Sequence, residues 1–201
     1  DAGRHYLRMA FAADPVRQAK VHLAAALRLA VLHQLEEGID NHFTVTVPGA
    51  GERYLILPFG LHWSEARASD MIVFDEAGRT LEGSGVVELS AQCIHAPIHR
   101  ICGARVVMHT HQPWALALNM LKDNRLVPAS QTAAFFHGHV AYDDTYMGTA
   151  DHVEEGERLG HGLRRAQVDL HLRARLLERL GEHVVVAHDD RHPQVHGRLL
   201  E

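Results

Sequence analysis

The 201-residue sequence has few cysteines, no long apolar run and no excess of basic charge. Its two cysteines, Cys93 and Cys102, are too few for a disulfide scaffold and fit a reducing cytoplasm. No apolar run approaches the roughly 20 residues that cross a bilayer, and the first residues lack the charged and then apolar segments of a secretory signal. The net charge is −5 with histidine neutral, and no basic stripe is present. We therefore expect a cytoplasmic protein with neither a nucleic-acid nor a membrane partner.

The sequence does contain enough apolar residues, 46%, to bury a core, and its length fits one domain over 1–201. Helical and strand-like periodicities alternate or pair along it, which indicates an α/β or α+β sandwich. A cap at Asp14 and a stop at Gly38 enclose the first helix, and Pro97 should bend the second. The predicted helices cover 16–35, 90–101, 114–121 and 153–163, and the predicted strands cover 43–47, 54–57, 71–75, 105–111 and 140–142.

Histidine is abundant, with 18 residues, and two of these end the strand over 105–111. Side chains at i and i+2 of a strand point to the same face, so His109 and His111 should emerge together. Two imidazoles on one face can chelate a divalent metal; the alternative is a pair of hydrogen-bonded surface histidines. A catalytic zinc usually has three protein ligands, so a third must come from elsewhere. The candidates by residue type are His95, His99, His137, His139, His161 and His171.

Other templates do not supply a site. There is no phosphate-binding loop, no dinucleotide-binding glycine motif and no nucleophile elbow. His95 and His99 lie one helical turn apart and can bind metal, or they can be ordinary solvated or core-edge histidines. Cys93 is best interpreted as a residue of the helix core.

The order of five segments resembles that of the class II aldolase/adducin family over roughly residues 16–163. These segments are 36–45, 68–78, 95–100, 106–111 and 138–143. The resemblance implies a three-layer α/β/α fold with a central, largely antiparallel sheet, and a homotetramer with active sites at subunit interfaces. It also implies a zinc or other divalent ion, such as manganese, bound by a His-x-His pair and a distant third histidine. In the sugar-phosphate aldolases this ion polarises the substrate and stabilises the enediolate that carbon–carbon cleavage leaves. His109 and His111 match the pair.

Three positions depart from the aldolase pattern. Ala91 stands where the aldolases have the glutamate or aspartate that moves the proton, and alanine cannot accept one. Glu88, one turn earlier, is the candidate substitute for this catalytic role; the alternative is a helix-start glutamate favoured by the helix dipole. Asp40-Asn41 and Phe59-Gly60 replace the phosphate-binding loops, so an unmodified sugar-phosphate aldolase is not expected. The 58–61 loop looks more like the adducin-like branch.

The C-terminal segment also departs from the family, which continues into a strand ending in Asn-His-Gly. No such motif occurs in this chain. The third ligand would fall near Ala174, and His171 is the nearest candidate. We interpret residues 164–201 as a divergent segment. One hypothesis is a replaced or frame-shifted tail; the other is a naturally divergent tail that packs on the domain, with His171 as the third ligand.

Two functions follow from these observations. The first is a metal-dependent, lyase-like protein that performs aldol cleavage or decarboxylation on a small hydroxy-carbonyl or carboxylate compound. The second is a non-catalytic adducin-like domain that keeps the fold and the oligomer.

Overall fold

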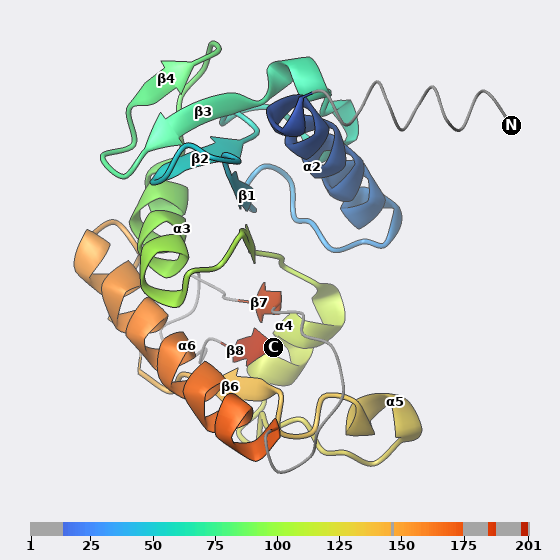
Figure 1. Cartoon of the computed structure of the whole chain (residues 1–201). Coiled ribbons are helices and arrows are strands. Elements are labelled where there is room, and N and C mark those ends of the chain that lie inside the picture. Colours follow the sequence, from blue (N-terminus) through green and yellow to red (C-terminus); the bar gives the residue numbers. More distant parts are fainter. Residues whose placement is uncertain (1–13, 146, 175–184, 188–197, 201) are drawn as a thin grey trace, which may run out of the picture.

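The computed structural model describes residues 14–145, 147–174, 185–187 and 198–200, with side chains as far as residue 167 (Figure 1). Within this part of the chain, no helix is both long and apolar enough to cross a membrane. The helices are α2 (Pro15–Leu32), α3 (Leu89–Cys102), α4 (Pro113–Asn119), α5 (Gln131–Ala134) and α6 (Val153–Ala174), with short 3-10 turns at Trp63–Glu65 and Ala68–Asp70. The strands are β1 (Phe43–Thr46), β2 (Arg53–Ile56), β3 (Ile72–Asp75), β4 (Thr80–Glu82), β5 (Val106–Met108), β6 (Val140–Tyr142), β7 (Val185–Ala187) and β8 (Arg198–Leu200).

The first five strands form one antiparallel sheet in the order β4-β3-β2-β1-β5. Alternation along β2 and β3 sends Leu55 and Val73 into the core cluster that contains Leu23 and Leu27 of α2. Their neighbours on the opposite face form a second cluster with residues of α3, including Ala91. One helix therefore covers each face of the sheet (Figure 1). The predicted α/β/α fold with a central antiparallel sheet is confirmed.

Helix α2 begins as predicted but ends earlier. The Asp14 carboxylate accepts hydrogen bonds from the backbone N–H groups of Val16 and Arg17, both at 3.0 Å. The expected stop at Gly38 was wrong, because the helix ends at Leu32. Gln34 takes a left-handed conformation with φ 55°, and its neighbour's backbone N–H bonds to the Ala30 carbonyl at 3.0 Å, which closes the helix. A glutamine at this position gives no sequence signal comparable to glycine.

Helix α3 continues through Pro97, as predicted. Proline has no N–H, so the carbonyl of Cys93, four residues earlier, loses its partner within the helix. Helix α6 lies against this point: a methyl group added at Gly156 would come within 1.8 Å of the Cys93 oxygen. The α-hydrogen of Gly156 therefore points at the carbonyl that Pro97 leaves open. Close packing of α6 on α3 depends on a glycine here.

Helix α6 is longer than the predicted 153–163 and runs to Ala174, across the expected boundary at residue 164. Strand β4 was not predicted, because its three residues are all exposed and carry no alternation. Strand β5 is shorter than the predicted 105–111. Strand β6 lies where predicted and belongs to a second, three-stranded sheet in the order β6-β8-β7.

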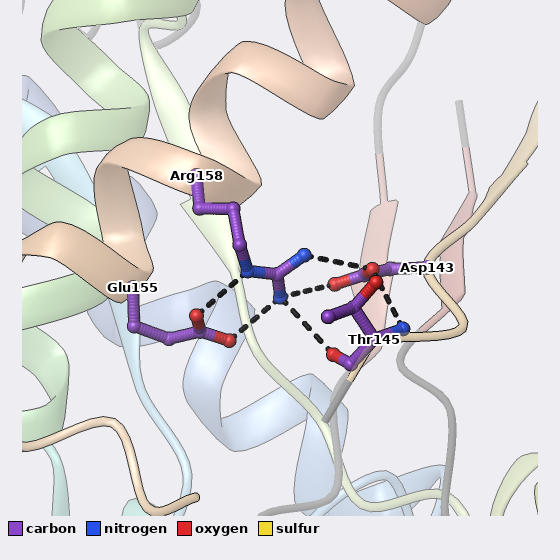
Figure 2. Close-up of polar contacts among 4 residues, drawn as sticks. All are labelled: Asp143, Thr145, Glu155 and Arg158. Atoms are coloured by element: carbon purple, nitrogen blue, oxygen red, sulfur yellow. Dashed lines mark hydrogen bonds and ion pairs between the residues drawn. The ribbon is translucent and has the colours of Figure 1, made fainter. Parts of the chain in front are cut away.

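An arginine links α6 to the segment that follows β6 (Figure 2). The Arg158 guanidinium donates through Nη1 to Asp143 Oδ1 at 2.8 Å and through Nε to Glu155 Oε2 at 2.8 Å. Its Nη2 also donates to the Thr145 carbonyl at 3.3 Å. These hydrogen bonds raise the pKa of Arg158 well above its usual range, because both carboxylates favour the charged form. The segment after β6 is thus fixed to the first two turns of α6.

Candidate metal centre

Four buried histidines from three parts of the chain meet beside the central sheet. His42 precedes β1, His95 lies in α3, and His109 and His111 follow β5, with exposed fractions of 7%, 0%, 3% and 3%. His42, His95 and His109 each offer a ring nitrogen, and these three nitrogens lie within 4.8 Å of one another. Among the residues described, this trio is the one group of histidine, cysteine and acidic side chains that could hold a metal ion.

His109 and His111 come together as expected, although they lie just beyond β5 rather than within it. The His109 backbone N–H bonds to the His42 carbonyl at 2.8 Å, and that of His111 bonds to the Leu35 carbonyl at 3.1 Å. These bonds keep the backbone extended past the end of the strand. The two Nε2 atoms face each other at 3.0 Å.

A carboxylate outside the predicted site fixes the orientation of His111. Its Nδ1 lies 3.1 Å from Oε2 of Glu37, and a carboxylate can only accept a hydrogen bond. His111 therefore carries a hydrogen on Nδ1 and, when neutral, presents a lone pair on Nε2 towards His109. Metal-binding histidines commonly have such a carboxylate partner. Glu37 was missed because it belongs to an irregular loop, where no periodicity marks an inward-facing side chain.

A second chain of hydrogen bonds fixes His95. His99 Nδ1 lies 2.6 Å from the Ala104 carbonyl, and Thr44 Oγ1 lies 2.8 Å from both His99 Nε2 and His95 Nδ1. The carbonyl can only accept, so His99 carries its hydrogen on Nδ1, and its Nε2 accepts the single hydroxyl hydrogen of Thr44. Thr44 then accepts from Nδ1 of His95. When His95 is neutral, its Nε2 therefore has no hydrogen and presents a lone pair.

The environment keeps both of these rings neutral. Burial lowers the pKa of His99 to about 4, and burial with the neighbouring histidines lowers the pKa of His95 well below its usual value. His99 is thus a satisfied core histidine, one of the two alternatives drawn from the sequence. His95 differs, because its Nε2 is buried and has no hydrogen-bond partner among the described residues.

Glu88 lies at the start of α3 and close to the cluster. Its carboxylate accepts a hydrogen bond from the Ala91 backbone N–H at 2.9 Å, which makes it the helix cap. The same carboxylate lies 3.5 Å from Nε2 of His42. Ala91 is fully buried on the inner side of α3. Glu88 therefore caps the start of α3 and also lies beside the histidine cluster.

The remaining candidates from the sequence do not join the cluster. His137, His139 and His161 are exposed. His171 falls in the last turns of α6, but its side chain lies outside the described part of the chain. Burial raises the pKa of the Cys93 thiol, and this side chain belongs to the helix core.

The sequence matches a family model described as "Class II Aldolase and Adducin N-terminal domain" over residues 21–189. The chain belongs to this class II aldolase/adducin family.

Curated relatives of this class II aldolase/adducin chain carry different names. A Pseudomonas aeruginosa protein named for aldolase class 2 is 35% identical over 71% of this chain and 54% of its own length. Rat alpha-adducin is 33% identical over 68% of this chain and 18% of its own length. Decarboxylase NovR of Streptomyces niveus is 30% identical over 71% of this chain and 53% of its own length. This chain thus spans about half the length of the bacterial relatives, and less of adducin.

Solved structures show the same fold. An aldolase II superfamily protein from Pseudomonas syringae has a TM-score of 0.69 and 31% identity, covering 92% of this chain and 65% of that one. L-fuculose 1-phosphate aldolase from Glaciozyma antarctica has a TM-score of 0.64 and 21% identity, and the match covers 92% of this chain and 64% of the aldolase. The second likeness concerns the fold alone.

Proposed function

We propose that this chain is the metal-binding part of a lyase-like enzyme that performs aldol cleavage or decarboxylation on a small hydroxy-carbonyl or carboxylate compound. The observation that carries the proposal is the buried group of four histidines, in which His109 and His111 occupy the family's metal-pair positions. By analogy with the family, the ion would be zinc or a similar divalent metal, the assembly a homotetramer and the location the cytoplasm.

The donors fit a divalent ion of borderline softness. Imidazole nitrogens suit zinc, and tetrahedral ligation at 2.0–2.1 Å separates two donor nitrogens by about 3.4 Å. The 3.0 Å between the Nε2 atoms of His109 and His111 is close to that separation. A bound ion would supply Lewis-acid polarisation of a carbonyl or carboxylate oxygen. Glu37 would orient His111 from behind, through the hydrogen bond at Nδ1.

A small pocket next to the histidines is the proposed place for the substrate. Its lining includes His42, Glu88, Asn41 and the Phe59-Gly60 loop, so both altered loops of the sequence meet at this pocket. The Nδ2 amide of Asn41 is buried and has no hydrogen-bond partner among the described residues, which leaves a donor for a substrate oxygen. Glu88 provides a carboxylate at the same pocket, and we propose it as the group that carries the proton in place of Ala91.

The alternative function, a non-catalytic adducin-like domain, has one specific observation in its favour. Ala91 is fully buried at the position where the aldolases carry their acid/base residue, so no carboxylate projects from that point of α3. The adducin relatives show that proteins not named as enzymes share this domain. A domain of this kind would keep the sheet and the histidine cluster as structure only.

Metal analysis of the purified chain, followed by an activity screen, tests the proposal. We expect close to one equivalent of divalent metal, lost in His109→Ala, and turnover in a panel of aldol donors and hydroxy-carboxylates. Glu88→Gln should retain the metal and lose most of the turnover. Less than about one tenth of an equivalent of metal, unchanged by His109→Ala, would remove the basis of the proposal. Metal without turnover of any compound would favour the adducin-like alternative.

A further inference from the structure

We propose that the pocket next to the histidine cluster receives an apolar end group of the substrate and excludes a phosphate group, with Phe59 as the residue that determines this specificity. The inference rests on the proposed function, because the hydroxy-carbonyl or carboxylate end of the substrate is placed at the proposed ion. It narrows the substrate class to small compounds whose far end is apolar or aromatic and carries no negative charge.

The first argument concerns charge. None of the described residues that line this pocket is lysine or arginine, and Glu88 lines it with a carboxylate instead. Proteins bind phosphate through cationic side chains or through free backbone N–H groups. The N–H groups of Phe59 and Leu61 are already bound to the carbonyls of Val86 and Pro58, at 2.9 and 3.4 Å. A phosphate group would therefore meet a carboxylate without a cationic partner, and like charges repel.

The second argument is that the walls of the pocket are apolar and aromatic. Phe43 and Trp63 line it from the buried core cluster, with ring centroids 4.5 Å apart. Phe59 lines the same pocket but is 51% exposed, which places its ring at the opening. An apolar group that enters from solvent would cover this ring. Aromatic rings also gain from offset or edge-on packing against one another, so an aromatic end group fits best.

The backbone holds Phe59 at the opening. Its N–H group bonds to the carbonyl of Val86, whose side chain is 69% exposed. Gly85 lies so close to Pro58 that an added methyl group would come within 2.4 Å of the proline Cβ. The loops that carry Phe59 and Val86 are therefore packed together. Each of them presents an exposed apolar side chain.

The polar side chains of the pocket lie at the histidine cluster. His42 belongs to both, the Glu88 carboxylate lies 3.5 Å from its Nε2, and Asn41 is its neighbour in the chain. The other side chains that line the pocket are apolar. Binding sites for small molecules commonly combine a few polar groups with a mostly apolar lining. A hydroxy acid with an apolar end group matches this division, because its oxygen atoms and its apolar end meet different parts of the pocket.

Isothermal titration calorimetry of the full chain with Zn²⁺ tests the inference without relying on activity. The probes are lactate, 3-phenyllactate and 3-phosphoglycerate, which share a 2-hydroxypropanoate frame and carry hydrogen, phenyl or phosphate on C3. We expect phenyllactate to bind at least about 10-fold more tightly than lactate, which corresponds to about 1.4 kcal/mol. Phosphoglycerate should bind less tightly than lactate.

Substitutions at Phe59 assign the preference to this residue. Phe59→Ser should reduce the preference for phenyllactate over lactate to about 2-fold, whereas Phe59→Leu stays apolar and should retain most of it. Phe59→Arg supplies the missing cation and should raise the affinity for phosphoglycerate by about 10-fold. Leu32→Ser removes an exposed apolar side chain on α2, outside the pocket, and is the matched control. It should leave the preference unchanged.

Two results would overturn the inference. The first is a wild-type chain that binds phenyllactate no more tightly than lactate or phosphoglycerate. The second is a preference that Phe59→Ser leaves intact; weaker self-association of this variant in sedimentation velocity would then assign Phe59 to a contact between copies of the chain.

Failure of the proposed function gives a different result. A chain that prefers phenyllactate through Phe59, but binds no metal and turns over no compound, would support this pocket and defeat the lyase activity. Turnover of a phosphorylated compound in preference to its apolar counterpart would support the lyase activity and overturn this inference. Circular dichroism of each variant shows that the fold is retained.

Discussion

Thr44 sets the hydrogen positions of two histidines with a single hydroxyl group. It is 0% exposed, and its Oγ1 lies 2.8 Å from both His95 Nδ1 and His99 Nε2. Thr44→Val keeps the shape of the side chain but removes the group that holds the His95 hydrogen on Nδ1. The valine leaves Nδ1 of His95 and Nε2 of His99 buried without a partner at this position, so the free energy of unfolding should fall by about 2–3 kcal/mol. Thr44→Ser restores the hydroxyl and should recover most of the stability. Equal stabilities of the valine and serine variants in urea unfolding would contradict this prediction.

The buried ring of His99 makes the stability of the metal-free chain depend on pH. Folding lowers its pKa from 6.5 to about 4, mainly through burial. Between these values the unfolded state binds more protons, so the free energy of unfolding decreases as the pH falls from 6.5 towards 4. His99 alone should contribute a loss of about 3 kcal/mol over this range. Urea unfolding with a chelator present, at a series of pH values, measures it.

The control for this prediction replaces histidine by glutamine at two positions, one buried and one exposed, and compares how the free energy of unfolding changes with pH. His99→Gln should flatten the acid side of the stability profile, whereas His33→Gln, at the exposed end of α2, should leave the profile parallel to that of the wild type. Parallel profiles for both variants would show that His99 is not the group responsible.

At the scale of elements, two glycines of α6 have opposite roles. A methyl group at Gly156 would lie 1.8 Å from the Cys93 oxygen and 2.9 Å from the Ile94 Cα, so the helices must move apart. Gly156→Ala should therefore lower the free energy of unfolding by about 3 kcal/mol. Gly162 has nothing nearer than Arg165 Nη2 at 3.9 Å, and Gly162→Ala should raise stability by about 0.5–1 kcal/mol. Urea unfolding of the two variants, six residues apart on one helix, compares them directly. A similar change in both would show that α6 does not pack closely on Cys93.

The Arg158 contacts join α6 to the segment after β6 through two carboxylates (Figure 2). Lysine has one nitrogen and cannot reproduce this planar set of hydrogen bonds. Arg158 is 30% exposed, so part of its interaction is screened by solvent, and Arg158→Lys should cost about 1–2 kcal/mol. Arg165→Lys, an exposed change on the same helix, should cost nothing measurable in the same unfolding experiment. If the two variants unfold alike, the ion pairs of Arg158 do not stabilise the fold.

The sequence predicts most of these elements because their signals are local. Asp14-Pro15 marks the start of α2, and alternation marks β1. Short apolar runs mark β2 and β3, whose side chains enter core clusters on both faces of the sheet. The sequence prediction is wrong or incomplete where no such local signal marks the end of a helix or the position of a strand. Helix α2 ends at a left-handed glutamine, and β4 is an edge strand with no buried residue. No pattern over one turn or one strand reports either feature.

For the whole molecule, the site shows the same division. The spacing of His109 and His111 predicts that both side chains lie on one face, because side chains two residues apart on an extended chain point the same way. The hydrogen on Nδ1 of His95, however, depends on a hydroxyl 51 residues earlier in the chain, and the hydrogen on Nδ1 of His111 depends on a glutamate 74 residues earlier. Such dependence appears only when the sheet brings β1, α3 and β5 together. The sequence therefore indicates the chemical type of the site, whereas the orientation of its histidine rings requires the fold.

Apolar side chains exposed over residues 114–136 bear on the assembly. Trp114 is 88% exposed, and four further large apolar side chains in this stretch are more than half exposed: Met120, Leu121, Val127 and Phe135. Monomeric proteins rarely expose large apolar patches, so this run of exposed apolar side chains supports the proposal that another copy of the chain covers them. Trp114→Ser should weaken self-association by about 30-fold or more, the loss typical of a central interface tryptophan. Leu32→Ser, at a residue that is 76% exposed on α2, is the matched control and should leave association unchanged. Sedimentation velocity over a range of concentrations measures both, and a wild-type chain that remains monomeric throughout would remove the basis for this prediction.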